Sequence, residues 1–228
     1  MNPPVKSSLK NKSIIRTVFT TFLSALWIFL IISILLKLFV FQQVTVVGPS
    51  MEPNYYTGQG LIVNQIDKNF DRGQVVAVFK DRELAKTANF FTKFQATIYL
   101  KRIIALPGES IEMINEKVII YNSANPGGKV LNEDYLGANI IKGLKSERFY
   151  YPKTLIAPET YFLMGDNRIN SQDSRNLGAF PKVSLFGQEI LRFWPWPTAE
   201  IFTRPSYIFS DIDLETKNEL SLIGSGRL

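Results

Sequence analysis

The chain has 228 residues and contains neither histidine nor cysteine. These absences exclude the Ser-His-Asp relay, the Cys-His pair and any metal site built from His or Cys ligands. Because no disulfide can form, the folded part must be stable without one. A nucleophilic serine in this chain would need a lysine or a carboxylate as its base. We expect no metal and no other cofactor.

Charge is almost absent from Val18 to Phe41, about 24 residues in which Lys37 is the single charged side chain. At roughly 1.5 Å rise per residue, a helix of this length crosses the ~30 Å hydrocarbon core of a bilayer. A buried helix of a soluble core would show a polar face, and residues 27–32 show none. The run is too long for a signal peptide, and no small-x-small exit follows it. We therefore predict an uncleaved helix that anchors the chain in a lipid bilayer.

The net charge of +6 comes mostly from four cations that precede this helix: Lys6, Lys10, Lys12 and Arg16. By the positive-inside rule they hold the N-terminus in the cytoplasm, which puts the remaining chain on the outer face of the cell membrane. The basicity is thus a topology signal, and we expect no nucleic-acid partner.

After the helix, short apolar or β-branched runs alternate with turn residues, a pattern typical of antiparallel strands. The predicted strands are 43–47, 60–64, 74–79, 98–106, 110–113, 117–121, 161–164 and 183–194. We therefore predict a mainly β fold behind a single transmembrane helix. The expected domains are a basic tail (1–17), the helix (18–41), a catalytic β core (42–107 and 159–205), a small insert of strands and loops (108–158) and a mobile polar tail (206–228).

Two segments suggest a nucleophile and its base. Ser50 lies on a Gly-Pro-Ser turn directly after the strand 43–47, which predicts a position near the bilayer surface. Lys101 and Arg102 are adjacent cations in an apolar strand, and because neighbouring side chains point to opposite faces, one of them should be buried. A buried lysine has a lowered pKa and can act as a general base. The alternative is a solvent-facing lysine that guards a sheet edge.

A third segment, 165–176, is dense in Asp, Asn, Arg and Ser. A calcium loop is disfavoured, because Arg168 stands at the third position of such a loop and Leu177 at the twelfth. A network of Asp and Arg pairs that locks the loop explains the composition better. A hydroxyl such as that of Ser171 could then orient a neutral amine.

Together, four segments resemble type I signal peptidases, the membrane-anchored serine proteases that use a Ser-Lys dyad. The segments are Ser50-Met51-x-Pro53, Arg72-Gly73-x-Val75-Val76, Lys101-Arg102 with Pro107-Gly108, and Gly165-Asp166-Asn167-Arg168-x-Asn170-Ser171-x-Asp173-Ser174-Arg175. They follow the family's order behind an N-terminal anchor, and the resemblance spans about residues 14–197. It implies an endopeptidase that removes signal peptides from exported preproteins. We expect it to act as a monomer.

The resemblance implies roles for individual residues. Ser50 would attack the scissile carbonyl, and its backbone N–H would stabilise the oxyanion. Lys101 would act as base and then as acid to the leaving amine. Ser171 would orient the Lys101 amine, and three charged residues would hold the loop: Asp166, Asp173 and Arg175.

The resemblance also implies how substrate binds. An extended peptide would pair with the strand 44–47 and with the strand before Lys101. A shallow pocket for small side chains would select Ala-x-Ala-type exits, and the positions that match its lining are Val46, Met51, Tyr55, Tyr99 and Leu100.

Some positions depart from the family pattern. Gly48 stands where some members carry a serine hydroxyl for the oxyanion, and Gln74, Glu109 and Asn54 differ from the usual residues at turns. The insert is also short. Two alternatives to the peptidase share some of these features. A self-cleaving Ser-Lys protein of the SOS-repressor kind needs a DNA-binding region, for which there is no room before Ser50. The other is a membrane-anchored, non-catalytic β domain that binds a partner.

Overall fold

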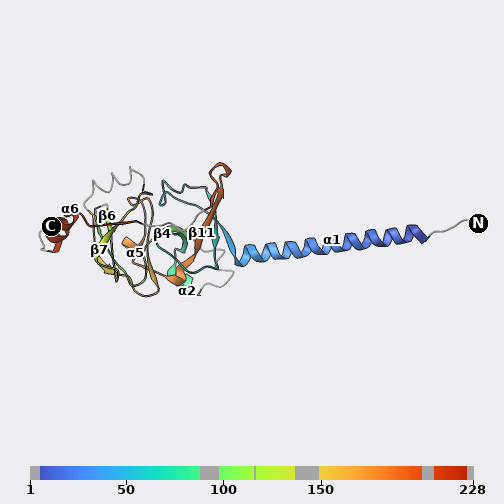
Figure 1. Cartoon of the computed structure of the whole chain (residues 1–228), viewed down its shortest axis with the longest axis horizontal. Helices are drawn as coiled ribbons and strands as arrows, with labels where there is room; N and C mark the ends of the chain where they lie inside the picture. The colour runs from blue at the N-terminus through green and yellow to red at the C-terminus, as the bar shows by residue number, and fades with distance from the viewer. Residues whose placement is uncertain (1–5, 88–97, 116, 137–148, 202–207, 225–228) are drawn as a thin grey trace, which may run out of the picture. The chain divides into compact units, whose positions relative to one another are not determined.

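The computed structural model describes residues 6–87, 98–115, 117–136, 149–201 and 208–224 (Figure 1). Contacts divide the chain into two compact units, Met1–Gln42 and Gln43–Leu228. Parts of the expected insert (137–148) and of the expected tail (206–207 and 225–228) lie outside the described residues.

The first unit is a single long helix, α1 (Lys6–Phe39). Within it, Ile14–Leu36 is long and apolar enough to cross a membrane by length and composition, and large side chains such as Trp27 and Phe29 are 66% exposed. Sequence analysis extended the span to Phe41, but Phe41 begins the strand β1 (Phe41–Thr45). The apolar run continues past the helix because the strand that follows is also apolar at its start.

In the second unit, most of the predicted strands form one antiparallel sheet in the order β1-β2-β11-β3-β4-β9-β10, with β12 pairing β11. Its strands after β1 are β2 (Gly60–Asn64), β3 (Val75–Phe79), β4 (Ile98–Ala105), β9 (Thr160–Met164), β10 (Phe180–Pro181), β11 (Leu185–Trp194) and β12 (Glu200–Ile201). Short helices complete it: α2 (Arg82–Thr87), α5 (Ser174–Leu177), η1 (Lys182–Ser184) and η2 (Trp196–Thr198).

The expected insert forms a second antiparallel sheet, in the order β13-β7-β6-β5-β8. Its strands are β5 (Ser110–Ile114), β6 (Lys117–Asn122), β7 (Asn125–Leu131), β8 (Tyr150–Leu155) and β13 (Phe209–Ser210). The predicted hairpin 110–121 is present as β5 and β6. The composition after Asn122 suggested loops, yet β7 and β8 form there because they pair with β6 and β5, which the local sequence does not reveal.

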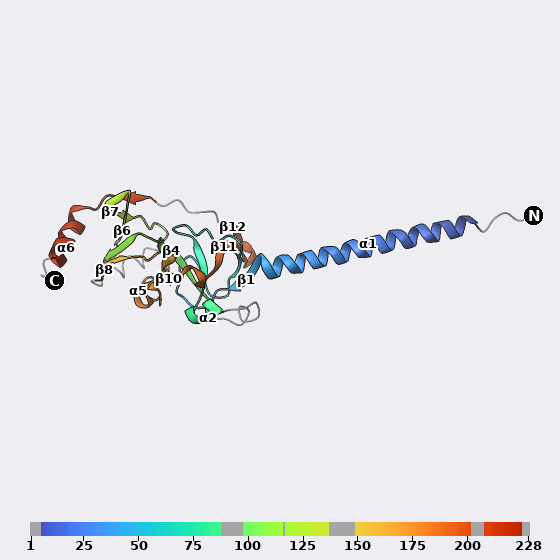
Figure 2. The ribbon, with the colours of Figure 1, turned by 90° about the horizontal axis from the view of Figure 1, so that it is seen from below.

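The described part of the expected mobile tail contains regular structure. Strand β13 pairs with β7, and the helix α6 (Leu214–Gly224) lies beside the second sheet (Figure 2). Ion pairs connect Lys117 to Asp213 at 2.7 Å and Lys129 to Asp211 at 2.5 Å. The polar side chains of this segment are therefore used in part for contacts with the insert, which composition by itself does not indicate.

Strand β4 crosses the centre of the first sheet between β3 and β9. Its two neighbouring strands are strongly apolar and buried, β3 along its whole length and β9 from Tyr161 onward. Side chains on β4 therefore enter low-dielectric surroundings, and any charged group there needs a specific partner or a function.

Candidate active site

Ser50 lies in the turn between β1 and β2. Gly48 adopts φ +87°, a conformation that favours glycine, and the Glu52 N–H donates to the Pro49 carbonyl oxygen at 3.1 Å. The Ser50 carbonyl oxygen accepts a hydrogen bond from the Asn167 N–H, also at 3.1 Å. Within the described residues, the Ser50 N–H donates no hydrogen bond. It is therefore available to an oxygen of a bound substrate.

Lys101 reaches Ser50 from β4. Its Nζ donates to Ser50 Oγ at 2.8 Å and to the Leu100 carbonyl oxygen at 3.0 Å. Lys101 is 2% exposed, so the structure excludes the solvent-facing alternative. Arg102 is buried as well, which differs from the expectation of one buried cation. The buried charge of Arg102 is compensated by an ion pair with the carboxylate of Asp166 at 2.6 Å.

Burial lowers the pKa of Lys101 from its ordinary value to about 8, because an ammonium group is poorly solvated there. The charges of Asp173 and Asp166 act in the opposite direction, and the charge of Arg175 adds to the lowering. A neutral amine can accept a proton from a hydroxyl at hydrogen-bond distance. The geometry and the protonation of Lys101 thus both suit a general base for Ser50.

Asp166 ties the loop 165–176 to β4 and to the Ser50 turn. Its carboxylate accepts hydrogen bonds from Arg102 Nε at 2.8 Å and from Arg102 Nη2 at 2.6 Å. A third comes from Asn54 Nδ2 at 2.8 Å. Asn54, one of the departures from the family pattern, therefore connects the segment after Ser50 to this loop.

Asp173 holds the same loop from within. It accepts the Gly165 N–H at 3.0 Å and forms the expected ion pair with Arg175 at 2.9 Å. Burial by itself raises the pKa of Asp173, but the hydrogen bonds and charge of Arg175 and the Gly165 N–H outweigh it and leave that pKa below its ordinary value. Asp173 therefore stays ionised and keeps its partners in place.

Gly165 brings this loop directly against the nucleophile. A β-carbon at position 165 would overlap both the Ser50 carbonyl oxygen and Ser171 Oγ. Ser171 Oγ is buried and has no hydrogen-bond partner within the described residues. Ser171 is the residue expected to orient the Lys101 amine, and Lys101 Nζ donates to Ser50 and Leu100 in this structure. Ser171 therefore lies beside Ser50, and its hydroxyl also contributes to lowering the pKa of Asp173.

The five positions expected to line a pocket divide into two groups. Four belong to one buried apolar cluster, which also contains Leu61 and Val75: Val46, Met51, Tyr55 and Leu100. Tyr99 is only partly buried and packs against a different cluster. The Tyr99 ring also contacts Lys101, whose Nζ lies 5.2 Å from the ring centre.

Residues 19–194 match the family model described as signal peptidase, peptidase S26. The chain belongs to the signal peptidase family. It is 34% identical to signal peptidase I P of Bacillus subtilis subsp. natto over 76% of this chain and 88% of the relative. It is also 34% identical to signal peptidase I S of Bacillus subtilis strain 168, over 82% and 92% respectively.

A crystal structure of a signal peptidase I from Enterococcus faecalis V583 is similar as well, with 27% identity and a TM-score of 0.38. The match covers 53% of this chain and 96% of the crystallised one. The family assignment confirms the predicted family and the predicted class of enzyme, a serine peptidase and hydrolase. The mainly β fold behind an N-terminal apolar helix is confirmed too.

Two residues of this signal peptidase that sequence reasoning missed lie next to the predicted site. Glu133, in the insert, accepts hydrogen bonds from both terminal nitrogens of Arg168. Glu189, on β11, accepts the Tyr55 hydroxyl at 2.5 Å. Glu133 also accepts the hydroxyl of nearby Tyr135, but the contacts that link these two residues to the site come from Arg168 and Tyr55, each more than thirty residues away in the chain.

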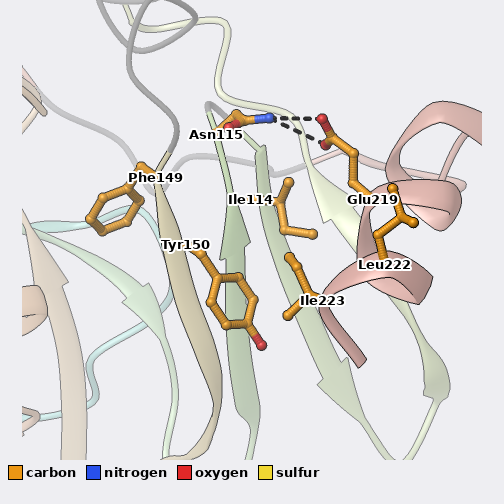
Figure 3. A pocket seen from close by; sticks show the side chains of 7 residues that line it. All are labelled: Ile114, Asn115, Phe149, Tyr150, Glu219, Leu222 and Ile223. Carbon is orange, nitrogen blue, oxygen red and sulfur yellow. Dashed lines mark hydrogen bonds between the residues drawn. The ribbon is translucent and has the colours of Figure 1, made fainter. Parts of the chain in front are cut away.

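The C-terminal segment after residue 194 lies beyond the family match. Its helix α6 forms one wall of a pocket. This cavity of about 430 Å³ lies between the second sheet and α6 (Figure 3). Asn115 Nδ2 donates to both carboxylate oxygens of Glu219 at its edge, at 3.1 and 3.2 Å. The remaining lining residues are largely apolar: Ile114, Phe149, Tyr150, Leu222 and Ile223. None of the predicted site residues lines it.

Proposed function

We propose that this signal peptidase removes N-terminal signal peptides from exported preproteins by a Ser50–Lys101 dyad, cutting after small-x-small exits of the Ala-x-Ala type. The observation that carries the proposal is the 2.8 Å hydrogen bond between Ser50 Oγ and the amine of a lysine that is 2% exposed. A buried amine beside an otherwise weak nucleophile supplies the base that histidine provides in other serine proteases.

In the first step, Ser50 Oγ bonds to the scissile carbonyl carbon while its proton passes to the neutral Lys101 amine. The carbonyl oxygen becomes an oxyanion that accepts the Ser50 N–H. The C–N bond then breaks, the Lys101 ammonium returns the proton to the leaving amine, and an acyl ester on Ser50 remains. Water attacks this ester with Lys101 again as base, which releases the signal peptide and restores the enzyme.

The loop residues have supporting roles in this proposal. Asp166, Asp173 and Arg175 hold the loop against the Ser50 turn through the contacts described above. The buried hydroxyl of Ser171 would donate to or accept from the Lys101 amine once that amine releases Ser50. An extended substrate would add beside residues 44–47 and 98–100, with its small side chain in a pocket lined by Val46, Met51, Tyr55, Tyr99 and Leu100.

We further propose that α1 anchors a monomer as a single-pass protein of the cell membrane. The cations Lys6, Lys10, Lys12 and Arg16 would keep the N-terminus in the cytoplasm, and the catalytic domain would face the outside. The domain division predicted from the sequence, with an insert at 108–158 inside a catalytic core, is part of this proposal.

The test is cleavage of a preprotein with an Ala-x-Ala exit, in detergent, by the wild type, Ser50→Ala and Lys101→Ala. The wild type should cut after the exit, and both variants should lose at least 10³-fold in kcat/KM, since each removes one half of the dyad. Ser184→Ala, at a buried serine of the short helix η1, is the matched control and should keep its activity. A Lys101→Ala variant that still cuts would refute the dyad.

A further inference from the structure

A buried carboxyl group, Glu189, lies behind the proposed substrate pocket. Glu189 is 8% exposed, and its Oε2 accepts a 2.5 Å hydrogen bond from the hydroxyl of Tyr55, which is 2% exposed. Its other oxygen, Oε1, is buried and has no hydrogen-bond partner within the described residues. A carboxyl with a buried, unpartnered oxygen costs free energy, so its retention calls for a reason.

The charged groups around Glu189 do not remove this cost. Burial raises the pKa of Glu189 to about 7, while the Tyr55 hydroxyl and the charges of Arg192 and Arg102 act in the opposite direction and Glu200 adds to the rise. Both arginines also serve other acceptors, because Arg102 pairs with Asp166 and Arg192 pairs with Glu200. Within the described residues, the hydrogen bond from Tyr55 is the one that this carboxyl accepts.

Tyr55 connects Glu189 to the reacting groups. Its ring belongs to the same buried cluster as Met51, which follows the proposed nucleophile Ser50, and Leu100, which precedes the proposed base Lys101. The ring is held at both ends, by apolar packing on its body and by Glu189 at its hydroxyl. A fixed aromatic ring in that cluster limits the space available to a substrate side chain.

We propose that Glu189 is a positioning residue that holds the Tyr55 ring in place, so that the substrate pocket accepts alanine and excludes larger side chains. This inference rests on the proposed function, because it concerns the selectivity of the same site. It assigns a role to a side chain on β11, more than one hundred residues from Tyr55 in the chain.

The experiment compares two model preproteins that differ only in the residue before the cleaved bond, alanine or leucine, and measures kcat/KM for each. In Glu189→Leu and in Tyr55→Phe the hydrogen bond is lost and the ring is released, so the preference for alanine should fall at least tenfold. Glu189→Gln is the matched control, since its amide oxygen can still accept the hydroxyl, and it should keep the preference within threefold.

The double variant Tyr55→Phe/Glu189→Leu separates positioning from stability. Removing both polar groups leaves neither partner unsatisfied, so its thermal unfolding should lie close to that of the wild type while the preference for alanine stays low. A wild-type preference in Glu189→Leu and in the double variant would overturn the inference. If the wild type cuts neither preprotein, or Ser50→Ala still cuts, it is the proposed function that fails.

Discussion

Lys101 and Arg102 show how two adjacent cations on one strand are used differently. Arg102 is neutralised by Asp166, through two hydrogen bonds of 2.8 and 2.6 Å. Lys101 has no carboxylate in ion-pair contact within the described residues, and its amine donates to a hydroxyl and a carbonyl oxygen. One cation thus organises structure, and the other is left with a lowered pKa that suits proton transfer.

Because the pKa of Lys101 is lowered in the folded state from its ordinary value to about 8, charging this side chain costs stability below pH 8. The cost disappears as pH rises from about 8 to about 10.5, where the unfolded chain also loses the proton. Lys101→Met should therefore be inactive yet more stable than the wild type by about 3 kcal/mol at pH 7, an advantage that shrinks above pH 8.

Chemical unfolding of both proteins in the same detergent, from pH 6 to pH 10, measures this difference. Lys86→Met is the control, since Lys86 is 54% exposed in its surface pair with Glu83 and its removal should change little at any pH. The same lowered pKa predicts that wild-type kcat/KM rises with pH through a limb centred near 8. A Lys101→Met protein less stable than the wild type at pH 7 would contradict the assignment.

Gly165 is the backbone position where the loop and the nucleophile come closest. In Gly165→Ala the added carbon would overlap the Ser50 carbonyl oxygen, so the loop must move away from Ser50. We expect kcat/KM for the preprotein to fall at least 100-fold. Gly127→Ala is the matched control, because no atom lies within 4 Å of the added carbon there, and it should keep full activity.

At the scale of elements, the loop 165–176 is held by contacts with three other parts of the chain: the Ser50 turn, β4 and the insert. Asn167 connects it to the Ser50 turn, through its N–H to the Ser50 carbonyl oxygen and through Nδ2 to the Pro49 carbonyl oxygen, both at 3.1 Å. Arg102 on β4 holds it through Asp166. The insert holds it through Glu133, which pairs with Arg168. The second sheet is therefore connected to the proposed site by a buried ion pair.

Glu133→Gln tests this connection. The side chain of Arg168 is 2% exposed, so loss of its counterion leaves a buried, uncompensated charge that should cost about 3–5 kcal/mol of stability. We also expect kcat/KM to fall at least tenfold, because the loop loses one of its three attachments. Unfolding and cleavage assays on the same preparation measure both effects.

The control for that experiment is Glu83→Gln, which breaks an ion pair whose two side chains are 54% and 81% exposed and which should change neither quantity. If Glu133→Gln loses stability but retains full kcat/KM at a temperature where it is folded, the insert does not contribute to positioning the loop.

At the scale of the whole molecule, α1 and the β-rich unit are separate compact units, which suggests separate tasks. In the proposed function, the helix confines the enzyme to the membrane where preproteins emerge, and the second unit does the chemistry. A chain that begins at Val40 should fold and cleave a soluble peptide with wild-type kcat/KM. It should cleave a preprotein embedded in vesicles at least tenfold more slowly than the full chain.

A matched chain in which residues 14–36 are replaced by a leucine and alanine span of equal length should recover cleavage in vesicles, since only length and apolarity are required. Equal cleavage of the embedded preprotein with and without α1 would contradict an anchoring role. Loss of peptide cleavage in the shortened chain would mean that the second unit does not fold by itself.

The sequence by itself determined the features that depend on composition or on neighbouring residues. The apolar run from Val18, the alternating strands and the missing histidine and cysteine are properties of neighbouring residues or of composition, and they predicted the helix, the mainly β fold and a lysine base. Short motifs predict Ser50 and Lys101 as the nucleophile and its base. Strand alternation also predicted a buried cation on β4, although it could not say that both would be buried.

Only the tertiary structure decided which distant groups meet. The pairs Glu133–Arg168 and Tyr55–Glu189, the strand β13 and the partners of α6 depend on contacts across long stretches of chain, for which a single sequence carries no periodic signal. The pKa of Lys101 belongs to this class too, because it is set by burial between β3 and β9. Local order follows from adjacent residues, whereas reactivity and selectivity follow from surroundings that folding brings together.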